Sequence, residues 1–151
     1  MPQPAATHAA IKIDRILPNC REHVWSAWAS FSKKKAWFGE GLEQLDFTPG
    51  GVERSSFITK MGVHDNETRY FEIEDRERIV FAYSMALNGR IHSVPRATVE
   101  FADESGGTRI AYTEQMCAIS PSDGAEGREA GWADLLDSLA DYLIHDTRTA
   151  A

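Results

Sequence analysis

Two carboxylates stand where the sequence predicts the inner face of a β-sheet. Glu114 shares one face of an alternating strand with Ile110, Tyr112 and Met116. A carboxylate on such a face must be ion-paired, protonated or hydrated, which makes it a candidate for acid–base chemistry or ligand binding. For Glu114 the alternative is a strand end in water.

Glu53 has a similar place on an earlier strand, although a register shift of one residue would turn it outward. If both face inward, they could share acid–base work when their surroundings drive their pKa values apart.

Other reactive residue types show no productive spacing. The five histidines form no pair at the separations that zinc sites use. Neither a Gly-rich phosphate loop nor a G-x-S-x-G elbow is present. Cys20 and Cys117 are far apart and fit no metal or redox motif, which is typical of reduced thiols in a cytoplasmic protein. We expect no metal and no cofactor.

A set of aromatic residues predicts either a plain hydrophobic core or the wall of a ligand cavity. Tyr83 and Tyr112 would each bring a hydroxyl group to an inner surface, and such groups orient ligands in mostly apolar clefts. The set consists of Trp25, Trp28, Trp37, Phe81, Tyr83, Tyr112 and Trp132.

The charge balance argues against a nucleic-acid surface. The 151 residues carry a net charge of −7, whereas phosphate binding needs clustered Lys and Arg. The one basic run, Lys33-Lys34-Lys35, is typical of a solvated helix end, with the rim of a site for an anionic ligand as the alternative. No stretch approaches the ~20 apolar residues of a membrane span, and the start of the chain does not resemble a signal peptide. We therefore expect a cytoplasmic protein with no nucleic-acid partner and no membrane span.

The pattern of the chain predicts one domain over residues 11–147, preceded by a loose leader over residues 1–10 and followed by a tail over residues 148–151. Period-two alternation predicts a first strand, and apolar residues at three- and four-residue spacing predict two short helices after it. These elements cover residues 11–17, 19–29 and 30–37.

Strands separated by turn signals follow the two helices. Asn88-Gly89 is a strong signal for a type I′ hairpin, and residues 62–66 read as a loop. Pro95 predicts an edge or a bulge in the penultimate strand. The expected sheet has about seven antiparallel strands, which places the chain in the α+β class.

The last element is an amphipathic helix of roughly 20 residues. Its apolar stripe includes Trp132, Leu135, Leu139 and Leu143. Gly127 and Gly131 weaken the first turns of this helix, and they indicate either fraying or a close backbone approach over the mouth of a cavity.

Several short motifs follow one another in a familiar order. They are Val24-Trp25, Trp37-Phe38-Gly39, Pro49-Gly50-Gly51, Gly107-Thr108-Arg109 and Gly131-Trp132. In this order they resemble the START-like superfamily, also called SRPBCC or birch-pollen-allergen-like, and within it the family named for activators of the heat-shock protein 90 ATPase. The resemblance implies a helix-grip fold, in which a curved antiparallel sheet wraps around the C-terminal helix. It also implies an interior that takes lipids, sterols, polyketides or other hydrophobic molecules.

The chain departs from the family pattern after Pro49-Gly50-Gly51. The family usually has aromatic residues at alternate positions there, whereas this chain has Glu53 and Ser55 before Phe57. The predicted cavity is therefore not purely apolar.

We expect the protein to bind a small apolar or amphipathic molecule between sheet and helix, for storage, transport or sensing. Two alternatives are a co-chaperone or protein-interaction module, and a cyclase, dehydratase or hydrolase that uses pocket acids. A protein partner is possible, and we expect a monomer or weak homodimer. The candidate ligand-binding residues are Trp25, Trp28, Trp37, Phe38, Glu53, Phe57, Phe81, Tyr83, Tyr112, Glu114 and Trp132.

Overall fold

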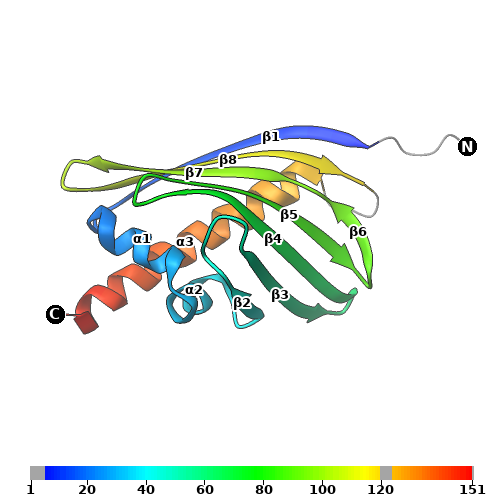
Figure 1. Ribbon diagram of the computed structural model, residues 1–151, viewed down its shortest axis with the longest axis horizontal. Coiled ribbons are helices and arrows are strands. Elements are labelled where there is room, and N and C mark those ends of the chain that lie inside the picture. The colour runs from blue at the N-terminus through cyan, green and yellow to red at the C-terminus, as the bar shows by residue number, and fades with distance from the viewer. Residues whose placement is uncertain (1–5, 120–123, 151) are drawn as a thin grey trace, which may run out of the picture.

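A curved antiparallel sheet wraps around one long helix (Figure 1). The computed structural model describes residues 6–119 and 124–150. Its elements in chain order are β1 (Thr7–Leu17), α1 (Arg21–Ala29), α2 (Phe31–Phe38), β2 (Leu42–Leu45), β3 (Val52–Thr59), β4 (Gly62–Glu74), β5 (Arg78–Leu87), β6 (Arg90–Ser93), β7 (Arg96–Glu104), β8 (Gly107–Ala118) and α3 (Gly124–Ala150).

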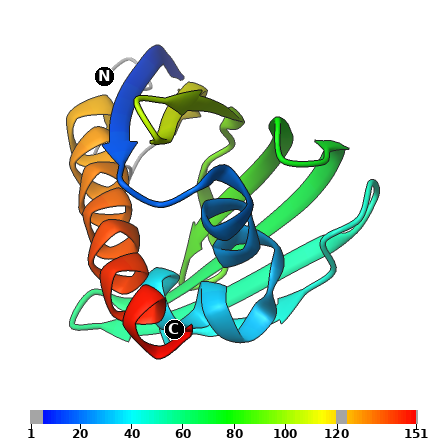
Figure 2. The same cartoon turned by 90° about the vertical axis from the view of Figure 1, so that its left-hand side faces the viewer.

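The sheet order confirms the α+β class and the helix-grip arrangement. The strands lie in the order β1-β8-β6-β5-β4-β3-β2, and β7 pairs with both β5 and β8. Helix α3 crosses the concave side of this sheet, while α1 and α2 close one end of the fold (Figure 2). The apolar stripe of α3 faces inward, because Trp132, Leu136, Leu139 and Leu143 are all buried.

The sheet has eight described strands, where the sequence predicted about seven. The difference arises at Pro95, which divides the predicted penultimate strand into β6 and β7. Both pieces lie between β5 and β8, so of the two predicted alternatives the sheet edge is wrong. A register shift of the bulge type is present just before Pro95, where β6 pairs with Met85 and Ala86 of β5. Proline has no backbone N–H to donate to a strand ladder, and its carbonyl instead accepts a 3.0 Å hydrogen bond from the Tyr83 N–H.

The predicted loop over residues 62–66 is also wrong, because these residues begin strand β4. The hairpin between β3 and β4 turns within Lys60 and Met61. It is held by a residue far along the chain, since the Asn88 side chain accepts from Val63 N at 2.9 Å and donates to Met61 O at 3.2 Å. The first residues of β4 lack an apolar stripe because their inward side chain, Asn66, faces a cavity instead of the core.

Both ends of the domain extend further than the sequence predicted. Strand β1 begins at Thr7, inside the expected leader, and pairs with β8 along its whole length. Helix α3 continues to Ala150, inside the expected tail, and has 27 residues instead of roughly 20. None of the described helices is long and apolar enough to cross a membrane.

Candidate functional site

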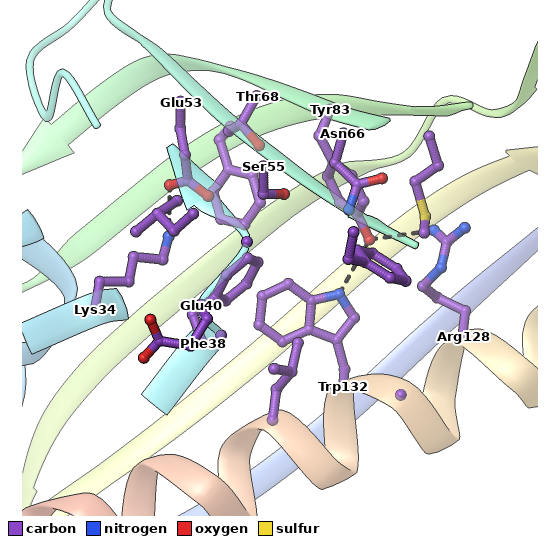
Figure 3. A pocket seen from close by; sticks show the side chains of 18 of the residues that line it. Lys34, Phe38, Glu40, Glu53, Ser55, Asn66, Thr68, Tyr83, Arg128 and Trp132 are labelled. Atoms are coloured by element: carbon purple, nitrogen blue, oxygen red, sulfur yellow. Dashed lines mark hydrogen bonds and ion pairs between the residues drawn. The ribbon is translucent and has the colours of Figure 1, made fainter. Parts of the chain in front are cut away.

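A cavity of about 600 Å³ lies between the sheet and the first half of α3. Strands β3, β4 and β5 form one wall, α3 forms the opposite wall, and α2 with the segment after it closes one side (Figure 3). The exposed lining residues Gly39, Glu40, Phe57 and Gly131 mark the mouth. A volume of this size is typical of sites for small organic molecules.

Strand pairing arranges the sheet wall in rows. Thr68 on β4 pairs with Glu53 on β3 and with Tyr83 on β5, so these three side chains form one row across the strands. Ser55 and Asn66 pair in the next row. Because side chains alternate between the two faces of a strand, all five residues point to the concave side. This wall is therefore polar along its middle (Figure 3).

A buried hydrogen-bonded cluster closes one end of the cavity. The Arg128 guanidinium donates to Glu114 Oε2 at 2.9 Å, to Tyr83 Oη at 3.1 Å and to Ser93 Oγ at 2.8 Å. Glu114 Oε1 also accepts hydrogen bonds from Tyr83 at 2.6 Å and Tyr112 at 2.5 Å. The Trp132 indole N–H donates to Tyr83 Oη at 3.0 Å. The charge of Glu114, which is fully buried, is thus compensated completely within the protein.

A second buried ion pair lies toward α2. Lys34 Nζ is 2.6 Å from Glu53 Oε1, and both residues are less than 5% exposed. The Tyr70 hydroxyl also donates to Glu53 Oε1 and accepts from Lys34 Nζ at 3.3 Å. The ammonium group lies 4.8 Å from the centre of the Phe38 ring, within the range of a cation–π contact.

The tyrosines in these two clusters hold their protons strongly. Burial raises the pKa of the Tyr83 hydroxyl well above its ordinary value, and the negative charge of Glu114 adds to the rise. Burial also raises the pKa of Tyr112 and of Tyr70, with further contributions from Glu114 and Glu53 respectively. The three hydroxyl groups therefore act as hydrogen-bond donors to the buried carboxylates.

The helix wall is apolar, with an indole at its centre. Trp132 stacks on Tyr112 at 4.2 Å between ring centres and approaches Phe38 at 6.3 Å. Leu135 continues this wall along α3. At Gly131 a Cβ atom would meet no other atom within 4 Å, so the missing side chain leaves room at the mouth. Gly127 and Gly131 both line the cavity, but the predicted close backbone approach is not found at Gly131, where the neighbouring space is open.

Apart from Glu114, the structure divides the predicted site residues into two groups. Those that line the cavity are Phe38, Glu53, Phe57, Phe81, Tyr83 and Trp132. Those that lie in the hydrophobic core and do not line the cavity formed by the described residues are Trp25, Trp28, Trp37 and Tyr112. The expectation that these four residues line it is wrong. Helices α1 and α2 pack the three indoles against one another and against Phe101, and Tyr112 on β8 stacks on Trp132 and donates to Glu114.

Both candidate carboxylates face inward, and neither is a strand end in water. Glu114 lies behind Tyr83 and Arg128 and is not part of the cavity lining. Because each carboxylate is bound to its own buried cation, the two do not form a free acid–base pair. Among the described residues, no group of three His, Cys, Asp or Glu side chains could hold a metal ion.

Sequence reasoning missed both cations and two uncharged polar residues. Lys34 lies in the run that was interpreted as a solvated helix end, and only its neighbours Lys33 and Lys35 retain partial exposure. Arg128 follows Gly127 on the inward face of α3, where helical spacing with Trp132 was an available signal. The two uncharged residues are Asn66 and Thr68. Together with Ser55, which the sequence had indicated, they form the polar middle of the sheet wall.

Comparisons with known proteins agree with this architecture. Residues 20–144 match the family model described as Activator of Hsp90 ATPase homolog 1-like protein. A solved structure of an uncharacterised protein from Rhizobium leguminosarum is 34% identical, with a TM-score of 0.87 over 93% of this chain and 97% of that one. A protein from Rhizobium loti is also 34% identical, with a TM-score of 0.85 over 92% of this chain and 99% of that one. A protein from Chromobacterium violaceum, at 21% identity, has a TM-score of 0.76 over 89% and 96% of the two chains and shows the shared fold alone. No curated protein matches the chain.

Proposed function

The chain belongs to the Activator of Hsp90 ATPase homolog 1-like family, and from this premise we propose that it binds a small amphipathic molecule in the cavity between the sheet and α3. The observation that carries the proposal is the cavity of about 600 Å³, whose walls combine aromatic and aliphatic side chains with a few polar groups. Clefts of this composition are the usual sites for small organic ligands.

The buried ion pairs support binding over catalysis. An enzyme that used Glu53 and Glu114 as acid and base would need at least one of them free to exchange a proton with a substrate. Here Lys34 and Arg128 each neutralise one carboxylate, and tyrosine hydroxyls occupy further lone pairs. The cavity therefore offers a fixed surface for recognition.

The test is native mass spectrometry of gently purified protein, followed by identification of any molecule that dissociates from it. A bound small molecule in the wild-type protein is the expected result. Gly131→Leu places a leucine in the open space at the mouth and should abolish that binding. Ala130→Leu adds the same side chain at the next position, which is exposed and outside the lining, and should leave binding intact.

Titration followed by NMR gives the second readout, with naphthalene as a probe of the cavity. Chemical-shift changes should concentrate on β3, β4, β5 and the first half of α3. Changes confined to the outer surface, or equal binding by the Gly131→Leu and wild-type proteins, would contradict the proposal.

A further inference from the structure

The polar side chains on the cavity wall differ in whether they already have hydrogen-bond or ion-pair partners within the protein. Lys34 and Arg128 have buried carboxylate partners, and the Tyr83 hydroxyl has three partners of its own. By contrast, the side chains of Ser55, Asn66 and Thr68 make no hydrogen bond to any described residue, and Asn66 Oδ1 is buried. These three residues, which we call the Ser55 cluster, are uncharged polar groups of the lining that the described residues leave without a hydrogen-bond partner.

The Ser55 cluster is compact. Ser55 and Asn66 are direct cross-strand neighbours, and their Cβ atoms are therefore separated by roughly 5 Å. Thr68 lies two residues from Asn66 on the same face of β4. Figure 3 shows all three side chains on the sheet wall, across the cavity from Phe38 and Trp132. A molecule between the two walls would have an apolar face against the indole and a polar edge against the cluster.

The charges of the lining select against an anionic ligand. Each buried cation already has a carboxylate within 3 Å, so a ligand carboxylate would have to displace Glu53 or Glu114 to gain a partner. A charge that enters a buried site without a partner carries a large desolvation cost. Glu40 at the mouth adds an exposed negative charge and forms no ion pair with any described residue.

From these observations we infer that the Ser55 cluster is the specificity-determining part of the cavity, and that it selects an uncharged ring compound with neighbouring hydroxyl or carbonyl groups along one edge. The inference rests on the proposed function and assigns recognition to uncharged residues. The two ion pairs at the ends of the cavity fix the walls, and the ligand does not bind to their charges.

Three probes of one ring size test the inference by NMR titration at neutral pH. They are naphthalene, 2,3-dihydroxynaphthalene and 2-naphthoate. The two adjacent hydroxyl groups should make 2,3-dihydroxynaphthalene bind about 3–10-fold more tightly than naphthalene for each hydrogen bond formed with the cluster. The anion 2-naphthoate should bind more weakly than naphthalene.

Thr68→Val and Asn66→Leu remove the polar atoms while approximately keeping side-chain size. Each should lower the affinity for 2,3-dihydroxynaphthalene about 3–10-fold and should leave the affinity for naphthalene equal or higher. Met85→Leu changes an apolar residue in the row of Ser55 and Asn66 and should affect both probes equally. If one variant fails to fold, the other and Ser55→Ala give the same measurement.

The outcomes separate the two proposals. If naphthalene binds in the cavity but the hydroxyl groups add no affinity, or if 2-naphthoate binds most tightly, the inference about the Ser55 cluster is overturned and the proposed function stands. If no probe produces changes inside the cavity, both are overturned.

Discussion

The Arg128 guanidinium lies 2.9 Å from Glu114 Oε2, in a buried cluster that links the first half of α3 to β8. This contact joins the helix wall of the cavity to β8, a strand of the same sheet as the opposite wall. Removing either partner leaves the other as a buried charge without a counter-charge.

Removing the negative partner should therefore destabilise the fold. We expect Glu114→Gln to lower the free energy of unfolding by about 3–5 kcal/mol, because Arg128 would remain buried without a counter-charge. The double variant Glu114→Gln with Arg128→Met should recover most of the loss. Urea unfolding of the four proteins in this cycle measures the coupling, and additive losses would show that the two side chains do not act as a pair.

A similar argument applies to the pair toward α2. Lys34→Met leaves the Glu53 carboxylate buried with only the Tyr70 hydroxyl as a partner, so unfolding should become easier by about 3–5 kcal/mol. Lys35→Met is the matched control, because the adjacent lysine is partly exposed and should change stability by less than about 0.5 kcal/mol. Equal effects of the two substitutions in denaturant melts would contradict the assignment of Lys34 to the interior.

The buried face of α3 gives a prediction about packing. Leu139 is fully buried, and Leu139→Ala should cost about 2–5 kcal/mol through lost transfer energy and a residual cavity. Ile144 lies on the same helix but is 44% exposed, so Ile144→Ala should cost much less. Chemical denaturation of both variants checks the difference, and a loss below about 0.5 kcal/mol for Leu139→Ala would be inconsistent with the observed packing.

Tyrosine ionisation gives a prediction about alkaline pH. Burial raises the pKa of Tyr70, Tyr83 and Tyr112 above the ordinary value of 10.0, so the folded protein should resist forming tyrosinate at pH 10. The neutral hydroxyls contribute stability that is complete below pH 10 and is lost as the pH rises toward the folded-state values. Ultraviolet absorbance of tyrosinate, compared between native and urea-unfolded protein, measures the shift. Ionisation of all tyrosines near pH 10 in the native protein would disprove it.

The sequence predicts the framework well because its signals are local. Alternation identifies β5 and β8, and Asn88-Gly89 forms the predicted hairpin, with both residues at positive φ. The spacing of Leu139 and Leu143 likewise identifies the buried face of α3. The positions of these elements are set by residues only a few places apart in the chain, so a periodic pattern in the sequence is enough to predict them.

The site is less predictable because its contacts are not local. Lys34 and Glu53 are 19 residues apart, and they meet only because α2 packs beside the edge of the sheet. The partner of Glu114 comes from α3, and no spacing in the sequence connects the two. The start of β4 was missed for a related reason, since an inward polar residue such as Asn66 is indistinguishable from a loop residue until a cavity is known to face it.

Strand β3 presents three inward side chains of different chemistry in succession, namely Glu53, Ser55 and Phe57. Only Glu53 is tied into the framework, through its pair with Lys34. Under the proposed function, substitutions at Ser55, and at Asn66 opposite it, would change which molecule the cavity binds, while the ion pairs at its two ends persist. A lineage with this cavity would then have a route to new ligands through single-codon changes at the centre of the wall, without first having to accumulate compensating mutations in the core.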